Sequence, residues 1–253
     1  MQDVTNDLIL GGRVHLRQPA SGFRSGSDAV MLAAACHPPS GGRVLELGCG
    51  TGLPMLCLAA RRSDVSFVGM EIQPEIAALA RINIASNDWT TRGRVVVGDV
   101  SALPFGSHGF DLVLANPPYF DPARSRRSPD AARDLARADA AVPLGQWINA
   151  ALAPLAPGGH AVLILRRERL GDVQQALPAS ASLDIRALAG RPGRPAKRVL
   201  LRIHPESGGG RRELPAIALH EADGADTALA NAIMRDAVPI GWERTDKDST
   251  ETI

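Results

Sequence analysis

Residues 43–52 read RVLELGCGTG, and this stretch decides the predicted fold. Its first half is a short apolar run typical of a buried strand, and its second half is a loop with glycine at every other position. Pro54 follows in the first turn of a predicted helix, where its missing N–H costs nothing. Because glycine allows a sharp turn and a close approach to a ligand, this order predicts a binding loop at the end of a strand. The spacing differs from the dinucleotide fingerprint Gly-x-Gly-x-x-Gly.

Further along the chain, three more apolar runs each end at a residue that can accept hydrogen bonds. Residues 66–70 lead to Glu71, residues 94–98 to Asp99, and residues 110–115 to Asn116. Strands that alternate with helices predict an α/β fold with a parallel sheet, right-handed crossovers and helices on both faces. Ligands bind such sheets beyond the carboxyl ends of the strands, so we expect these acceptors to meet the glycine-rich loop at one edge.

Residues 116–120 read NPPYF and break the last of these strands. Proline lacks a backbone N–H and cannot continue a central ladder, so Asn116 stands at a rigid strand end. Its side-chain carbonyl, the carbonyl of Pro117 and the ring of Tyr119 together suit a planar group that carries an NH₂. The alternative is a strand that ends in a proline turn for packing reasons alone.

The chain resembles the class I S-adenosylmethionine-dependent methyltransferases in four features, which follow one another in this order: the motif at 46–52, Glu71, Asp99 and the Asn-Pro-Pro-Tyr motif at 116–119. The last motif resembles that of enzymes that methylate the exocyclic amine of adenine or the side-chain amide of glutamine. Residues 18–24 (QPASGFR) and 27–34 (SDAVMLAA) are similar to the bacterial tRNA(Val) adenine-N6-methyltransferase family. The resemblance covers residues 7–203.

The resemblance implies a Rossmann-like sheet, mostly parallel with an antiparallel last strand, preceded by a small N-terminal hairpin and helix. It implies S-adenosylmethionine as cofactor and tRNA as partner. The catalytic residues it implies are Asn116, Pro117, Pro118 and Tyr119. The expected cofactor contacts lie in the N-terminal segment and at the strand ends: Arg24, Glu46, Gly48, Gly50, Gly52, Glu71, Ile72, Asp99, Val100 and Asn116. Arg24 is expected near the methionine carboxylate. The alternative is that Arg24 is only a solvated charge in a loop.

Two basic segments are candidates for RNA contact. Residues 121–129 follow the reactive motif and are rich in arginine, and residues 186–212 hold eight Lys or Arg against the single acid Glu206. The candidate contacts are Arg124, Arg126, Arg127, Arg194, Lys197 and Arg198. Solvated loops are the alternative, since charge usually marks a solvated face.

Composition narrows the class of protein. A formal net charge of +1 argues against wholesale wrapping of a polyanion. No apolar run approaches the roughly 18 residues that span a bilayer, and the first residues lack the layout of a secretory signal, so we expect a cytoplasmic protein without membrane contact. The three cysteines and six histidines show no ligand spacing, which predicts reduced thiols and no metal.

The expected organisation has four parts. Residues 1–42 form an N-terminal extension, residues 43–206 the methyltransferase domain, residues 207–242 a C-terminal extension of it, and residues 243–253 a disordered tail. Within the first part we expect a two-residue turn at Gly11 and Gly12, and a helix over 29–36 with Ser27 as its N-cap.

Three functions remain open on the sequence. The first is methylation of an adenine amine in tRNA, and the second is methylation of protein glutamine or DNA adenine with the same motif. The glutamine alternative predicts a substantial N-terminal protein-binding domain, whereas about 40 residues precede the cofactor loop. The third is a non-catalytic cofactor-binding subunit, which the intact motif at 116–119 argues against. The oligomeric state is not predicted.

Overall fold

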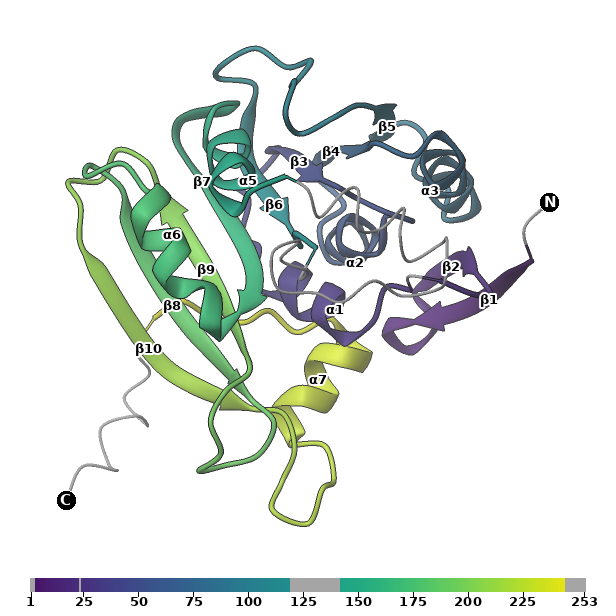
Figure 1. The fold of residues 1–253 in the computed structure, drawn as a ribbon. Coiled ribbons are helices and arrows are strands. Elements are labelled where there is room, and N and C mark those ends of the chain that lie inside the picture. The colour runs from purple at the N-terminus through teal and green to yellow at the C-terminus, as the bar shows by residue number, and fades with distance from the viewer. Residues whose placement is uncertain (1–2, 23, 119–141, 244–253) are drawn as a thin grey trace.

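The computed structural model describes residues 3–22, 24–118 and 142–243, and an eight-stranded sheet forms its centre (Figure 1). The strand order is β10-β8-β9-β7-β6-β3-β4-β5. In chain order these strands are β3 (Arg43–Leu47), β4 (Ser66–Glu71), β5 (Gly93–Val97), β6 (Phe110–Ala115), β7 (Leu155–Arg166), β8 (Ser182–Ala189), β9 (Arg198–His204) and β10 (Arg211–Ala218).

The strand directions agree with the predicted α/β sheet. Strands β3 to β7 are parallel to one another, whereas β9 runs antiparallel to both β7 and β8. Strand β9 is the predicted antiparallel strand. Strand β10 forms the edge of the sheet and pairs in parallel with β8. The order of crossovers reverses between β3 and β6, which places the expected ligand site at the carboxyl ends of those two strands.

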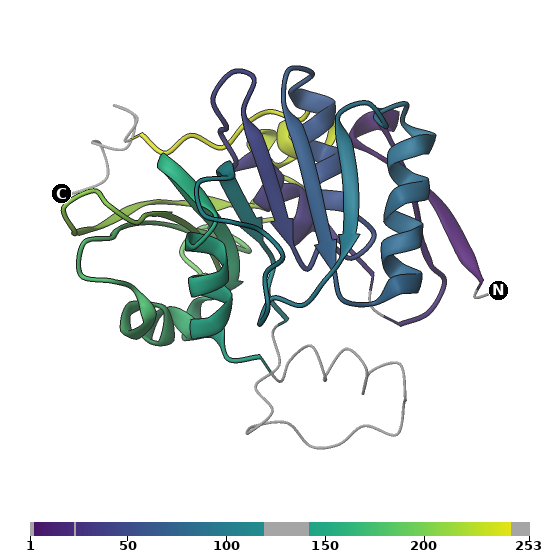
Figure 2. The same ribbon diagram turned by 90° about the horizontal axis from the view of Figure 1, so that it is seen from above.

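Two apolar cores cover the two faces of this sheet (Figure 2). Helices α1 (Ser27–Ala34), α2 (Leu53–Arg61), α3 (Pro74–Ser86) and α7 (Ala228–Asp236) pack on one face, and α5 (Leu144–Leu152) and α6 (Leu170–Ala176) pack on the other. Strand β6 shows why both faces are apolar: Leu112 and Leu114 point into the first core, and Val113 and Ala115 into the second. None of the helices in the described part of the chain is long and apolar enough to cross a bilayer.

The N-terminal hairpin differs from the prediction at its turn. Strands β1 (Val4–Ile9) and β2 (Val14–Pro19) pair with Ile9 opposite Val14, so the loop has four residues and the predicted two-residue turn was wrong. The cause is Leu10, which adopts a left-handed backbone and buries its side chain in the core instead of extending the strand. Helix α1 also begins two residues early, at Ser27, so Ser27 is not its N-cap. Gly26 holds that position, and no side chain caps the helix.

Candidate active site

The glycine-rich loop between β3 and α2 needs glycine for two separate reasons. Gly48 and Gly52 have left-handed backbones, and an added Cβ would lie 2.7 Å from Cη2 of Trp147 and 2.6 Å from Cε of Met55 respectively. Gly50 is also left-handed, but an added Cβ there would meet no atom within 4 Å. The packing of Gly48 and Gly52 therefore shapes the loop, while Gly50 presents open backbone to a ligand.

Hydrogen bonds from β4 and α3 fix this loop in place. The Cys49 amide donates to the carbonyl of Met70 at 2.9 Å, and the Gly50 amide donates to Oε2 of Glu71 at 2.8 Å. The carbonyl of Thr51 accepts from Nδ2 of Asn83 at 2.9 Å. The loop thus reaches a ligand already ordered, which lowers the entropy cost of binding.

Glu46 and Glu71, both predicted cofactor residues, occupy different positions relative to the loop. Glu46 is 2% exposed, and its Oε2 accepts from the Met55 amide at the start of α2, so it supports the loop from behind. Burial, and to a lesser degree the charge of Glu71, raises the pKa of Glu46 well above its usual range. Glu71 accepts from the amides of Gly50 and Gln73, one on each oxygen. A carboxylate is an acceptor only, which suits the hydroxyl donors of a ligand.

The ends of β4 and β5 come together as predicted. The Gly98 amide donates to the carbonyl of Glu71 at 3.0 Å, which brings Asp99 and Val100 beside Glu71 and Ile72. Ile72 is 42% exposed and offers an apolar surface, whereas Asp99 and Val100 are half-buried. One oxygen of Asp99 accepts from the amide of Ser101 at 2.8 Å.

Asn116 lies directly next to the glycine-rich loop. Ala115 on β6 is in register with Leu47 on β3, so the next residues along these parallel strands are Asn116 and Gly48. The Oδ1 atom of Asn116 is buried, and none of the described residues donates a hydrogen bond to it. A buried carbonyl oxygen without a donor is costly, so this atom is poised to accept one from a ligand. Pro117 and Pro118 follow it, and Tyr119 lies outside the described residues.

Arg24 is held by the N-terminal hairpin. Its guanidinium donates to Oδ2 of Asp7 at 2.8 Å and to Oγ1 of Thr5 at 2.9 Å. The side-chain hydrogen bond from Gln18, with the charge of Arg24, lowers the pKa of Asp7. The structure therefore gives Arg24 a role in holding β1 to the segment before α1, and a contact with the cofactor stays a prediction.

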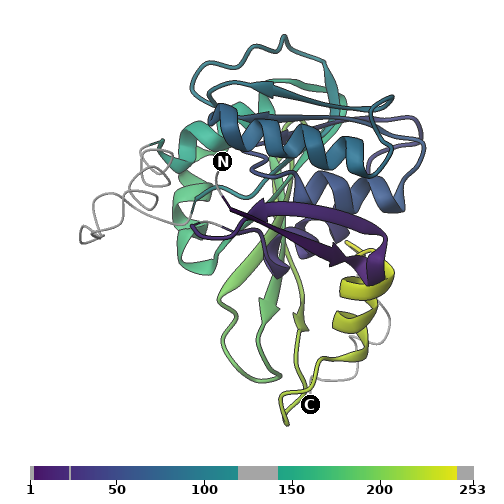
Figure 3. The same cartoon turned by 90° about the vertical axis from the view of Figure 1, so that its right-hand side faces the viewer.

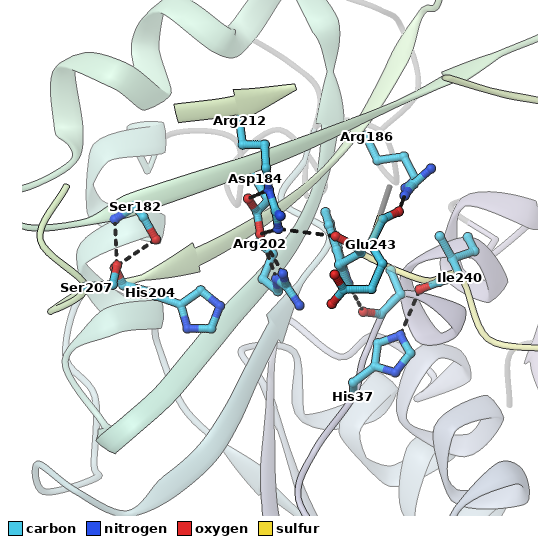
Figure 4. A network of polar contacts seen from close by, with 12 residues as sticks. His37, Ser182, Asp184, Arg186, Arg202, His204, Ser207, Arg212, Ile240 and Glu243 are labelled. Carbon is cyan, nitrogen blue, oxygen red and sulfur yellow. Dashed lines mark hydrogen bonds and ion pairs between the residues drawn. The ribbon is translucent and has the colours of Figure 1, made fainter. Parts of the chain in front are cut away.

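The basic segment at 186–212 divides into two groups. The first group is paired with groups of the fold: Arg202 and the exposed Arg212 both bind the buried carboxylate of Asp184, at 2.6 and 2.8 Å, while Arg186 donates to the carbonyls of Pro215 and Glu243 (Figure 4). The charge count along the sequence therefore overstated the surface available to RNA.

The second group lies at the same edge of the sheet as Asn116. Strand β9 starts there, because Arg198 pairs with Arg166 at the carboxyl end of β7. Arg198 binds Oδ2 of Asp28 on α1 at 2.8 Å, whereas Arg194 and Lys197 are exposed on the β8–β9 loop. The other RNA candidates, Arg124, Arg126 and Arg127, lie outside the described residues.

The groups at this edge of the sheet fit a nucleoside ligand. It combines open loop backbone at Gly50, a carboxylate at Glu71 and an apolar surface at Ile72. No group of three or more His, Cys, Asp or Glu that could hold a metal ion occurs among residues 3–22, 24–118 and 142–243. Cys36, Cys49 and Cys57 are free and buried.

Known proteins resemble this chain over most of its length. A family model described as a methyltransferase domain matches residues 44–138. The chain is 34% identical over 212 residues to a Porphyromonas gingivalis protein named tRNA1(Val) (adenine(37)-N6)-methyltransferase, covering 79% of this chain and 81% of that protein. It is 32% identical over 222 residues to a Yersinia enterocolitica protein of the same name, covering 85% of each chain.

A solved structure supports the fold. The crystal structure of a predicted O-methyltransferase from Agrobacterium tumefaciens superposes with a TM-score of 0.72 at 22% identity. The match covers 86% of this chain and all of the other. The predicted Rossmann-like methyltransferase sheet is thereby confirmed.

Proposed function

Because this chain belongs to the tRNA1(Val) (adenine(37)-N6)-methyltransferase family, we propose that it transfers a methyl group to the exocyclic amine of an adenine in tRNA. The chain is an S-adenosylmethionine-dependent methyltransferase. The observation that supports the adenine amine as acceptor is the buried Oδ1 of Asn116, which lacks a donor among the described residues and lies beside the glycine-rich loop.

The expected cofactor contacts follow from the loop and from the neighbouring strand ends. Gly50 would offer open backbone to the cofactor, in a loop that Gly48 and Gly52 shape, and Glu71 would accept hydrogen bonds from ribose hydroxyls. When bound, S-adenosylmethionine supplies a sulfonium methyl group that is already a strong methyl donor. The protein therefore has to align this group with the acceptor and to improve the acceptor as a nucleophile.

Asn116 and Pro117 would carry out the second task. The lone pair of the adenine amine is delocalised into the ring, which makes the amine a poor nucleophile. The NH₂ group would donate hydrogen bonds to Oδ1 of Asn116 and to the backbone carbonyl of Pro117. These bonds draw the nitrogen toward tetrahedral geometry and stabilise the positive charge that develops during transfer. Holding acceptor and methyl group in line contributes about 7–11 kcal/mol to the lowering of the barrier.

The acceptor base must leave its stack to reach Asn116. This step costs least in a single-stranded loop, where the base is not paired. Tyr119 would stack on the base, an interaction worth roughly 1–3 kcal/mol.

The exposed Arg194 and Lys197 would bind phosphates of the same RNA. The backbone amide of Arg167, at the end of β7, donates to the carbonyl of Lys197 at 3.1 Å and so holds the β8–β9 loop to the active-site edge. Arg198 is less suited to phosphate contact, because it already binds Asp28. We assign Arg198 to positioning α1 and the other two residues to the RNA backbone.

One labelling experiment tests this function. The protein is incubated with methyl-labelled S-adenosylmethionine and, separately, with bulk tRNA, genomic DNA and a protein extract. We expect label in tRNA alone, and N6-methyladenosine as the labelled nucleoside after digestion. Label that appears only in protein or only in DNA would contradict the proposal.

A further inference from the structure

Asn83 is a fully buried polar residue of α3 that the proposed chemistry does not use. Its Nδ2 donates to the carbonyl of Thr51 in the glycine-rich loop and to the carbonyl of Arg17 on β2, both at 2.9 Å. Its Oδ1 accepts from the Arg17 amide at 2.8 Å. Since both partners of Nδ2 are acceptors and the partner of Oδ1 is a donor, the orientation of the amide is fixed.

Asn87, one helical turn later, repeats half of this pattern. Its Oδ1 accepts from the His15 amide at 2.9 Å, and its Nδ2 donates to the His15 carbonyl at 2.8 Å. Residues four apart on a helix lie on one face, so the two asparagines pair with alternate residues of β2 much as a neighbouring strand would. Figure 3 shows the hairpin β1–β2 lying along α3. Both asparagines dock the hairpin, but the bond to Thr51 belongs to Asn83.

We propose that Asn83 is a positioning residue that couples the docked N-terminal hairpin to the glycine-rich loop and thereby sets the affinity for S-adenosylmethionine. From the side of β4, Glu71 and Met70 hold the amides of Gly50 and Cys49. From the side of α3, Asn83 holds the next carbonyl along, that of Thr51. Without this bond the loop samples more conformations, and each binding event has to order it.

The consequence for binding is separate from the methyl transfer itself. Asn83 contacts the loop backbone from within the core, since its side chain has no exposed surface. Its loss therefore lowers the population of the binding-competent loop and leaves the alignment of a bound cofactor with the acceptor unchanged. The inference depends on cofactor binding alone, whatever the acceptor substrate is.

The test compares Asn83→Ala with Asn87→Ala, a control at the C-cap of α3 that loses contacts to the hairpin and to the Asn83 carbonyl but none to the loop. The dissociation constant of S-adenosylhomocysteine is measured by calorimetry without RNA, together with the thermal midpoint of each variant. We expect both variants to have a lower midpoint. We expect Asn83→Ala to weaken affinity about tenfold, or about 1.4 kcal/mol, and Asn87→Ala to stay within about twofold of wild type.

A second variant and a second readout cover the case in which Asn83→Ala fails to fold. Asn83→Asp keeps the size of the side chain and the acceptor for the Arg17 amide, but loses both donors, and the same weakening is expected. Amide hydrogen exchange at Gly50 and Gly52 should be faster in the Asn83 variants and unchanged in Asn87→Ala. Unchanged affinity in the Asn83 variants, or equal weakening in Asn87→Ala, would overturn the inference. Failure of the wild-type protein to methylate tRNA would count against the proposed function and leave this result intact.

Discussion

Gly48 has a φ of +61°, and a Cβ placed there would lie 2.7 Å from Cη2 of the buried Trp147. Gly50 shares the left-handed backbone but has open space around it. We predict that Gly48→Ala lowers the free energy of unfolding by about 2–4 kcal/mol, since backbone strain and overpacking add. Gly50→Ala should cost about 1 kcal/mol, from backbone strain alone. Denaturant titration without cofactor measures both, and equal losses would show that the ring of Trp147 does not set the loop.

At the same scale, the sequence predicted the position of the strand-end residues better than their contacts. Glu46, Glu71, Asp99 and Asn116 all lie at one edge, because strand direction and side-chain alternation are local properties that the sequence carries. Their hydrogen-bond partners depend on which backbone amides the fold brings near. The sequence therefore gave no sign that Glu46 binds the Met55 amide, or that Asn83 reaches Thr51 across 32 positions. A polar residue on the core face of a predicted helix is the one signal that could have drawn attention to Asn83.

Helix α1 shows how elements far apart in sequence position the site. Near its first turn, Asp28 binds Arg198 on β9, 170 positions away. At its last turn, the Ile240 amide donates to the carbonyl of Ala34, and Nε1 of Trp242 donates to the carbonyl of Ala35. The segment that follows α7 therefore caps α1. The sequence pattern predicted α1, but pairings across such separations could not be read from local periodicity.

This arrangement predicts a specific effect of Trp242. Trp242→Phe keeps an aromatic ring in the core but removes the donor to the Ala35 carbonyl, so a buried acceptor loses its partner. We expect the free energy of unfolding to fall by about 1–3 kcal/mol. Trp89→Phe is the control, because Trp89 is only partly buried and packs at the edge of the core. Chemical denaturation followed by circular dichroism compares the two. Equal losses would mean that ring volume, and not the hydrogen bond, accounts for the effect.

At the scale of the whole molecule, charge is nearly balanced, so RNA affinity must come from a local surface. We predict that changing both Arg194 and Lys197 to Gln reduces the slope of log affinity against log salt concentration by about two, one per lost phosphate contact. The control changes Arg43 and Arg94 to Gln, two exposed arginines near the amino ends of β3 and β5, at the opposite edge of the sheet. Affinity for tRNA is measured at several salt concentrations. A slope that falls equally in both double variants would exclude the β8–β9 loop as the RNA surface.

Three half-buried histidines, His37, His160 and His204, predict a dependence of stability on pH. Burial lowers the pKa of His37, His160 and His204, with added repulsion from Arg202, and the pKa of His160 falls to about 3. Because a neutral histidine is favoured in the folded state, the unfolded state binds more protons below about pH 6.5. The stabilisation from these neutral histidines should therefore be fully present above that pH, and the free energy of unfolding should decline as pH falls toward 3. The slope from His160 alone approaches about 1.4 kcal/mol per pH unit.

Urea titrations between pH 8 and pH 5 measure this decline. His160→Asn should flatten it, while the same change at the exposed His108 should leave it as in the wild type. This account of the half-buried histidines fails if the slope is the same in both variants.

The kinetics of Asn116→Ala test the account most directly. Turnover of tRNA is measured at saturating S-adenosylmethionine, and the dissociation constant of S-adenosylhomocysteine is measured on the same preparation. We predict that kcat falls by about a hundredfold or more, since an acceptor for the developing charge is lost, while cofactor affinity stays near that of the wild type. Equal losses of turnover and of affinity, or unchanged turnover, would contradict a role for Asn116 in activating the amine.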